Sequence, residues 1–126
     1  MTDSKFLDSS AWLSYFYAEN LSIKALIESH DFLLTSVLSI FEIQLKMLKD
    51  NKQPVKIKKS LEFIKKRGLI LSLNEEIAGE AVEVSLKHKL SAMDSLIYTS
   101  ALKNQAIFIT LDNDFRGLKD AEILEI

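Results

Sequence analysis

Short apolar runs alternate along this chain with longer segments in which apolar residues recur every three or four positions. The short runs predict buried strands at about Lys5–Asp8, Phe32–Leu34, Leu69–Leu71, Ala106–Thr110 and, weakly and at a sheet edge, Glu122–Glu125. The longer segments predict helices at about Ala11–Ala18, Leu21–Ser29, Val37–Asn51, Pro54–Gly68, Glu75–Lys89 and Ala92–Asn104. Strands that alternate with helices are typical of an α/β protein in which helices cover a parallel sheet.

Several of these helices have recognisable signals at their ends. Ser10, Asn74 and Ser91 precede helical segments and are typical N-cap residues. Pro54 suits the first turn of a helix, where its missing N–H needs no partner. Gly68 follows the same helix, and we expect it to end that helix in the left-handed conformation.

Composition indicates the class of protein and argues against several kinds of site. A chain of 126 residues with 48% apolar and 27% charged residues is typical of a globular domain, so we expect residues 1–126 to form one domain. Cysteine is absent, and His30 and His88 lack the spacing of metal ligands, which argues against a zinc site. Because neither a membrane-spanning segment nor a signal peptide is recognisable, we expect a cytoplasmic protein with no membrane partner.

Positive charge is concentrated in one part of the chain, although the formal net charge is only −2. Residues 46–67 hold nine of the sixteen lysines and arginines, and only Asp50 and Glu62 oppose them. The commoner interpretation of such a run is a solvated helical face. The alternative is a surface that attracts phosphates toward a neighbouring acidic site. The candidate RNA contacts on that surface are Lys46, Lys49, Lys56 and Lys59.

Acidic residues follow two of the predicted strands. Asp8 ends the first strand, and Asp112 and Asp114 follow the strand that ends at Thr110. The carboxyl ends of parallel strands lie at one edge of a sheet, where α/β proteins bind ligands, so we expect these carboxylates to lie close together. The alternative for the later pair is a polar turn, which is common after strands but does not explain Asp8.

Glu42 lies in a predicted helix in which four apolar residues form a stripe. This stripe consists of Leu38, Phe41, Leu45 and Leu48. We expect the stripe to face the core and to carry Glu42 with it, because Glu42 follows Leu38 by four positions. A buried carboxylate needs a partner, and arginine is scarce here, so a metal ion or Lys46 is the more natural one. The alternative is that Glu42 lies at the margin of the stripe.

Asp94 has two interpretations between which the sequence does not decide. Ser91 and Asp94 fit a capping box at the start of a helix, with Asp in place of the usual Glu. Yet Asp94 shares a helical face with Ile97, Tyr98 and Ala101, which have the character of packed residues. An acid in the first turn of a buried helix can cap the helix and also face a cation.

Carboxylates brought together at one site repel one another and raise one another's pKa values, so they coexist stably around a cation. Oxygen ligands without Cys or His select Mg²⁺ or Mn²⁺. Such ions activate water and stabilise displacement at a phosphate. Acids at a strand edge, together with a basic surface, therefore indicate hydrolysis of a phosphodiester bond.

Four segments resemble the PIN-domain family, and within it the small single-domain VapC-type ribonuclease toxins. They are Phe6–Trp12, Ser36–Glu42, Leu90–Ile97 and Ile109–Phe115. Together they span nearly the whole chain, and their order and spacing are specific although no single segment is. The resemblance implies a three-layer α/β/α sandwich around a parallel sheet of about five strands. It also implies cleavage of RNA with Mg²⁺ or Mn²⁺ as cofactor.

The resemblance further assigns roles to residues and suggests partners. The implied metal-binding and catalytic acids are Asp8, Glu42, Asp94 and Asp112, with Asp114 as a secondary acid. The hydroxyl positions that support the acids match Ser10 and Thr110. Our hypothesis is that Asp8, Asp94 and Asp112 ligate one ion directly, while Glu42 acts directly, through water or in a second site. Family members commonly form homodimers, and the toxins pair with a small antitoxin protein, so both partners are expected.

Three other functions are considered. Phosphatase or phospho-acceptor chemistry with Asp8 as nucleophile is disfavoured, because Ser9 and Ser10 stand where a second acid is usual and Ile107–Thr110 contains no lysine. A PIN-like module that binds RNA or a protein without cleaving is disfavoured by the full set of acids. An RNA-processing nuclease without an antitoxin stays open, because the sequence does not distinguish it from a toxin.

Overall fold

The computed structural model describes residues 4–124, in which five strands form one parallel sheet. The strands are β1 (Lys5–Leu7), β2 (Leu33–Ser36), β3 (Leu69–Leu71), β4 (Ile107–Thr110) and β5 (Ala121–Ile123). Their order is β3-β2-β1-β4-β5, so β1 is central. The predicted α/β class and the parallel five-stranded sheet are confirmed. The predicted end of the last strand, Glu125, lies outside the described residues.

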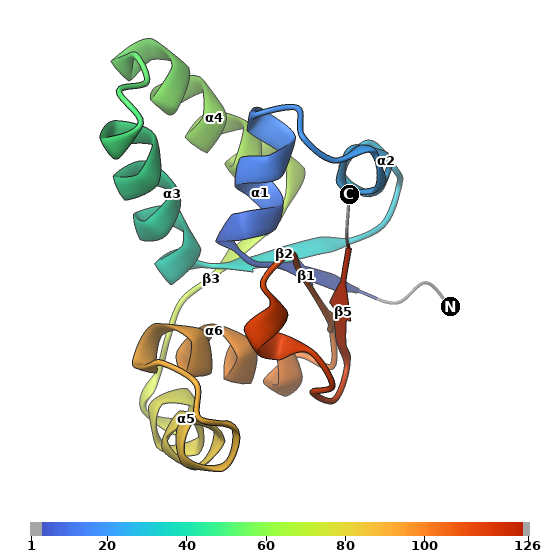
Figure 1. Cartoon of the computed structure of the whole chain (residues 1–126), viewed down its shortest axis with the longest axis vertical. Helices are drawn as coiled ribbons and strands as arrows, with labels where there is room; N and C mark the ends of the chain where they lie inside the picture. Colours follow the sequence, from blue (N-terminus) through green and yellow to red (C-terminus); the bar gives the residue numbers. More distant parts are fainter. Residues whose placement is uncertain (1–3, 125–126) are drawn as a thin grey trace.

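Six α-helices of the described segment cover the two faces of this sheet. They are α1 (Ser9–Phe16), α2 (Leu21–Ile27), α3 (Val37–Lys49), α4 (Pro54–Arg67), α5 (Glu75–His88) and α6 (Ala92–Lys103), with a 3₁₀ turn, η1 (Asn113–Phe115), after β4. Figure 1 shows α1 to α4 on one face of the sheet and α5, α6 and η1 on the other, which confirms the three-layer arrangement. None of the helices within residues 4–124 combines the length and the apolar composition that a membrane span requires.

The central strand β1 separates two hydrophobic cores. Side chains alternate across a strand, so Leu7 faces the core under α1 to α4, while Phe6 faces the core under α6. Trp12 lies in the first core, where its indole N–H donates to Thr35 Oγ1 (3.2 Å). The same Thr35 hydroxyl donates to the carbonyl oxygen of Leu7 (2.7 Å). These contacts join α1 to β1 and β2 beside the strand end that carries Asp8.

The start of α1 differs from the prediction. The helix begins at Ser9, and its N-cap is Asp8, whose Oδ1 accepts a hydrogen bond from the Ala11 N–H (3.2 Å). Ser10, which we predicted as the cap, lies inside the first turn. The prediction was wrong because a carboxylate at the strand end can itself cap the helix that follows it at once. Asp8 is therefore fixed by its strand and by its helix.

Gly68 ends α4, but with an extended backbone (φ −129°) instead of the predicted left-handed one. Its lack of a side chain matters for a different reason: a Cβ at this position would lie 3.3 Å from the Leu33 carbonyl oxygen of β2. Other predicted helix ends are confirmed. Pro54 opens α4, and the side chains of Asn74 and Ser91 each accept a hydrogen bond from the N–H three residues later.

The helix α3 is apolar on two sides, and the side that we predicted to be buried is mostly the exposed one. Ile43 and Met47 are fully buried in the first core. From the predicted stripe, Leu38 packs against the second core. We call the exposed row the α3 stripe: Val37 (43% exposed), Phe41 (57%), Leu45 (40%) and Leu48 (59%). Both rows have helical spacing, so periodicity alone does not show which row packs inward.

Arg67, the last residue of α4, binds backbone carbonyls. Its guanidinium donates to the carbonyl oxygens of Ile27 (2.6 Å), Ser29 (3.1 Å) and Asp31 (2.9 Å). These carbonyls belong to the end of α2 and to the loop before β2, so Arg67 fastens this connection onto α4. Arg67 is therefore a structural member of the basic run, in contrast to the exposed Lys66 before it.

Replacing Arg67 tests this contact. Arg67→Ala should lower the free energy of unfolding by about 2–3 kcal/mol, because hydrogen bonds from a charged donor to half-buried carbonyls are lost. Lys66→Ala is the matched control, and its effect should stay within about 0.5 kcal/mol because Lys66 is exposed on the same turn. Urea denaturation measures both variants. Equal stability of the two would show that Arg67 contributes no more than a surface lysine.

Candidate metal centre

The predicted acids come from the ends of β1 and β4, from η1, from the first turn of α6 and from the second turn of α3. Parallel pairing aligns Leu7 of β1 with Ile109 of β4, so the residues that follow these strands emerge side by side. We call five carboxylates the acid edge: Asp8, Glu42, Asp94, Asp112 and Asp114. They fall into a tight group of three and two further acids, of which Glu42 interacts electrostatically with Asp94 of the group and Asp8 interacts with Glu42.

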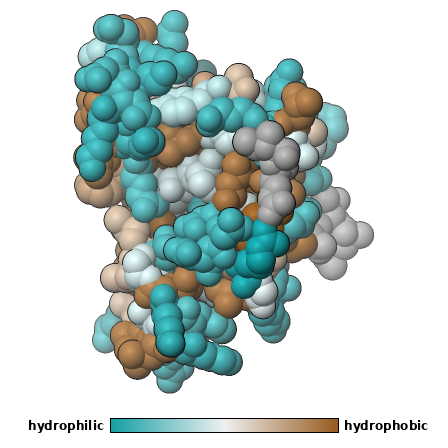
Figure 2. All heavy atoms as spheres, in the orientation of Figure 1, coloured by the Kyte–Doolittle hydropathy of each residue, from teal (hydrophilic) through white to brown (hydrophobic). Residues whose placement is uncertain are grey.

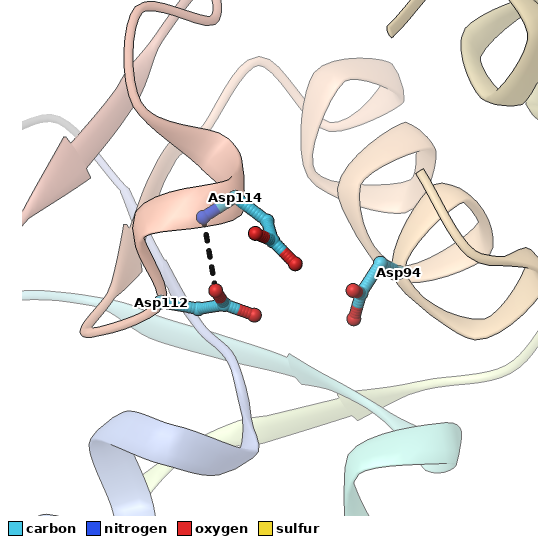
Figure 3. A group of neighbouring side chains, drawn as sticks. All are labelled: Asp94, Asp112 and Asp114. Atoms are coloured by element: carbon cyan, nitrogen blue, oxygen red, sulfur yellow. Dashed lines mark hydrogen bonds between the residues drawn. The ribbon is translucent and has the colours of Figure 1, made fainter. Parts of the chain in front are cut away.

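The tight group consists of Asp94, Asp112 and Asp114, which each place one carboxylate oxygen within 4.8 Å of the others. Figure 3 shows Asp94 pointing from α6 toward Asp112 and Asp114, which come from the turn after β4. Asp112 caps η1, since its Oδ1 accepts a hydrogen bond from the Asp114 N–H (2.9 Å). Burial, and then the charges of Asp112 and Asp114, raise the pKa of Asp94. The three carboxylates therefore repel one another as they stand.

Asp8 is buried, with 6% of its surface exposed. Its Oδ1 accepts from Ser10 Oγ (2.5 Å) and from the Ala11 N–H (3.2 Å), and its Oδ2 accepts from Thr110 Oγ1 (2.6 Å). Burial raises the pKa of Asp8 to about 6, although the hydrogen bonds lower it, and the charge of Glu42 adds to the increase. Asp8 lies outside the tight group, and the hydroxyls of Ser10 and Thr110 connect it to the turn that carries Asp112.

Two hydroxyls tie Asp8 to the turn that carries Asp112. Ser10 Oγ accepts from the Leu111 N–H (3.0 Å), and Thr110 Oγ1 accepts from the Asp112 N–H (3.0 Å). The same hydroxyls donate to Asp8, and their oxygens are 3.3 Å apart. Each hydroxyl therefore bridges the β1–α1 connection and the β4–η1 connection. The structure brings both predicted supporting residues into contact with Asp8.

Glu42 is half-buried and reaches the acid edge from α3. Its Oε1 accepts a hydrogen bond from Ser9 Oγ (2.9 Å). Lys46, the cationic partner considered from the sequence, instead pairs with Asp50 (3.2 Å). Burial, and less strongly the charge of Asp94, raise the pKa of Glu42. Sequence analysis missed Ser9, because its contact depends on how α1 and α3 pack across a separation of 33 residues, which no local pattern marks.

The chemistry of the acid edge fits a hard divalent cation. The ion pairs formed within residues 4–124 involve other acids, namely Asp31, Asp50, Glu76 and Glu80. The acid edge offers carboxylate oxygens alone, which suit Mg²⁺ or Mn²⁺. A cation would also reverse the effects of burial and repulsion that now raise the pKa values of Asp8, Glu42 and Asp94.

The four candidate lysines lie away from the acid edge. Lys46 and Lys49 are on the last turns of α3, and Lys56 and Lys59 are on the first turns of α4. All four are exposed. In Figure 1 these helix ends lie at the end of α3 that is remote from the sheet, and Figure 2 shows hydrophilic side chains gathered over the same part of the molecule. Lys46 lies one helical turn and Lys49 about two turns beyond Glu42 along α3, while Lys56 and Lys59 follow on α4, so none of the four is among the acids.

Comparisons with known proteins agree with this fold. A sequence profile described as the PIN domain matches residues 5–121. The comparison with curated proteins gave no significant match. Among solved structures, a toxin–antitoxin complex from Klebsiella pneumoniae contains a similar chain, with a TM-score of 0.80 and 17% sequence identity. The similarity covers 96% of this chain and 98% of that chain.

Two further structures are similar over nearly their whole length. VapBC2 from Rickettsia felis, bound to a DNA fragment from its promoter, gives a TM-score of 0.78 at 17% identity and covers 97% of this chain and 99% of that chain. VapC20 from Mycobacterium tuberculosis, described as a sarcin–ricin loop cleaving toxin, gives a TM-score of 0.76 at 14% identity. The similarity covers 96% of this chain and 99% of that chain. At these identities the likeness establishes a shared fold.

The pKa of Asp8 predicts how the stability of the metal-free protein depends on pH. Folding raises this pKa from 3.8 to about 6, so between these values the folded state holds a proton that the unfolded state has lost. Asp8 therefore favours the folded state below this window and disfavours it as pH rises through the window, by up to ~3 kcal/mol.

Asp8→Asn should remove this dependence. In EDTA, the variant should gain up to about 2 kcal/mol over the wild type near pH 7 and little near pH 4, because the amide carries no charge. Urea denaturation at both pH values measures the difference. Asp120→Asn, which removes an exposed carboxylate, is the control. A gain for Asp8→Asn that is the same at both pH values would contradict the assignment.

Proposed function

Because the chain belongs to the PIN domain family, we propose that it is a ribonuclease that hydrolyses RNA phosphodiester bonds with Mg²⁺ or Mn²⁺ as cofactor. The observation that supports this most is the acid edge, in which three carboxylates lie within 4.8 Å of one another, with Asp8 and Glu42 nearby. Oxygen donors so arranged suit a hard cation and phosphate chemistry. An RNA substrate would place the protein in the cytoplasm.

Each acid has a proposed role. The direct ligands would be Asp8, Asp94 and Asp112, with Asp114 as a secondary one. Glu42 would act directly, through water or in a second site. A bound Mg²⁺ or Mn²⁺ ion would neutralise phosphate charge and activate water for attack. The chain itself holds the oxygens in place before substrate arrives: Ser10 and Thr110 orient Asp8, and Thr110 also holds the backbone of Asp112.

The exposed lysines of α3 and α4 would attract the RNA strand. The proposed contacts are Lys46, Lys49, Lys56 and Lys59. Phosphate contacts of this kind add affinity without sequence preference and weaken as salt concentration rises. Because Lys46 and Lys49 lie one and about two helical turns beyond Glu42 along α3, and Lys56 and Lys59 lie on the helix that follows, they would bind nucleotides that flank the cleaved bond.

The proposed protein partner is a small antitoxin, which would make this chain the toxin of a toxin–antitoxin pair. This rests on the similar structures, of which one is a toxin–antitoxin complex and another is VapBC2 on its promoter DNA. The alternative is an RNA-processing nuclease that acts without an antitoxin. A short reading frame beside the gene that encodes a DNA-binding protein would support the pair.

We further propose a homodimer in which the α3 stripes of two copies pack together. The stripe exposes four large apolar side chains in one helical row, and pairing would remove them from water. A two-fold contact brings the same surface of both copies together, so one stripe can serve as both halves of the interface.

RNA cleavage in the presence and absence of metal tests the enzymatic proposal. The wild type should cleave RNA with Mg²⁺ or Mn²⁺ and stop in EDTA, whereas Asp112→Asn should lose at least about a hundredfold in rate while staying folded. Asp8→Asn should fail in the same way. Glu62→Gln, which changes an exposed acid on α4, is the control and should keep full activity.

The same assay separates the alternatives. Metal-dependent cleavage by Asp112→Asn at the wild-type rate would remove Asp112 from the site. If the wild type instead binds RNA and Mn²⁺ but cleaves neither tRNA nor rRNA, a binding module would be the better description.

The dimer has a test of its own. Phe41→Glu should convert the protein to monomers, because pairing would bury a charge near the middle of the interface. Light scattering after size-exclusion chromatography gives the mass. Leu21→Glu, at an 84% exposed position on α2, is the matched control and should remain dimeric. A wild-type monomer, or a Phe41→Glu dimer, would contradict the proposed interface.

A further inference from the structure

Ser9 and Ser10 are neighbours at the start of α1, yet their hydroxyls serve different acids. Ser10 Oγ donates to Asp8 Oδ1 (2.5 Å), whereas Ser9 Oγ donates to Glu42 Oε1 (2.9 Å). Successive residues of a helix point about 100° apart, so adjacent hydroxyls can face different elements. Here Ser10 faces the end of β4, and Ser9 faces α3. The family resemblance accounted for Ser10 and gave Ser9 no role.

The Glu42 carboxylate depends on this single contact. Within residues 4–124, Ser9 is the one hydrogen-bond donor to Glu42, whereas Asp8 accepts three hydrogen bonds. Lys46, one turn further along α3, forms its ion pair with Asp50 and not with Glu42. A glutamate side chain has one more rotatable bond than an aspartate, so a single hydrogen bond strongly affects where its oxygens lie.

Glu42 interacts electrostatically both with Asp8 and with the tight group. Its charge raises the pKa of Asp8, and the charge of Asp94 raises the pKa of Glu42 in turn. Oε1 is engaged by Ser9, while Oε2 accepts no hydrogen bond from residues 4–124. Ser9 itself follows the N-cap directly, so its position is fixed by the first turn of α1.

We propose that Ser9 is a positioning residue for Glu42, whose hydroxyl holds Oε1 so that Oε2 is presented to the acid edge. The inference rests on the proposed function in one respect, because it takes the acid edge to be the cation site. Ser9 and Ser10 then have parallel roles, since each orients one acid that comes from outside the tight group.

Two substitutions of Ser9 test the hydroxyl, with Mn²⁺ titration by electron paramagnetic resonance and RNA cleavage as readouts. Ser9→Ala removes the donor and should weaken Mn²⁺ binding and lower kcat by about 10–100-fold, with KM for RNA within about twofold of the wild type. Ser9→Thr keeps the donor and should stay within about threefold of the wild type in both readouts. Thermal unfolding shows that both variants fold.

Two further variants show whether Ser9 acts through Glu42. Ser60→Ala is the matched control, because Ser60 is buried in α4 and donates to the Lys56 carbonyl (2.9 Å), so its loss should leave both readouts unchanged. Glu42→Ala completes a double-mutant cycle. If Ser9 acts through Glu42, adding Ser9→Ala to Glu42→Ala should weaken Mn²⁺ binding no further.

The outcomes separate this inference from the proposed function. Ser9→Ala with wild-type Mn²⁺ affinity and kcat would overturn the role of Ser9, and so would an additive effect in the Glu42→Ala background. A wild type that binds Mn²⁺ but cleaves no RNA would overturn the proposed function. The double-mutant cycle measured by Mn²⁺ binding would then test the role of Ser9 by itself. A wild type that binds no Mn²⁺ would overturn both.

Discussion

Repulsion among carboxylates is the constraint around which one edge of this sheet is organised. Asp8 caps α1, Asp112 caps η1, and Asp94 lies in the first turn of α6. The unpaired N–H groups at the start of a helix favour negative charge, so these positions offset part of the repulsion. The hydrogen bonds that the Asp8 carboxylate accepts lower its pKa, but burial raises this pKa by more, so the charged form of Asp8 is still disfavoured. The edge is therefore held together by the rest of the fold.

Much of this arrangement could be predicted from the sequence, because it follows from where strands end. Asp8 and Asp112 come directly after apolar runs, and parallel strands bring such positions to the same edge. The side of α3 that packs inward could not be predicted in this way. Its two apolar rows satisfy the same periodicity, and only the packing of Ile43 against the core decides between them.

Contacts between distant segments were equally hidden from local patterns. The Ser9 hydrogen bond to Glu42 requires α1 and α3 to pack in one register, and Gly68 is explained by its approach to β2 and not by its own dihedral angles. The contact of Thr110 with Asp8, which the family resemblance implied and no local pattern shows, spans 102 residues. Closing so long a loop is opposed by chain entropy, so the acid edge is complete only after β4 has joined β1.

Trp12 gives this architecture an optical consequence. It is the one tryptophan of the chain, and its indole N–H is bound to the Thr35 hydroxyl that also holds the Leu7 carbonyl. A natural fluorophore is thus located where α1 packs against β1 and β2, four residues after Asp8 in the sequence. Its emission is sensitive to the packing of α1 against β1 and β2, which also determines how the Asp8 carboxylate is oriented. Changes at the acid edge that reach α1 can therefore be followed by intrinsic fluorescence, with no label attached near the acids.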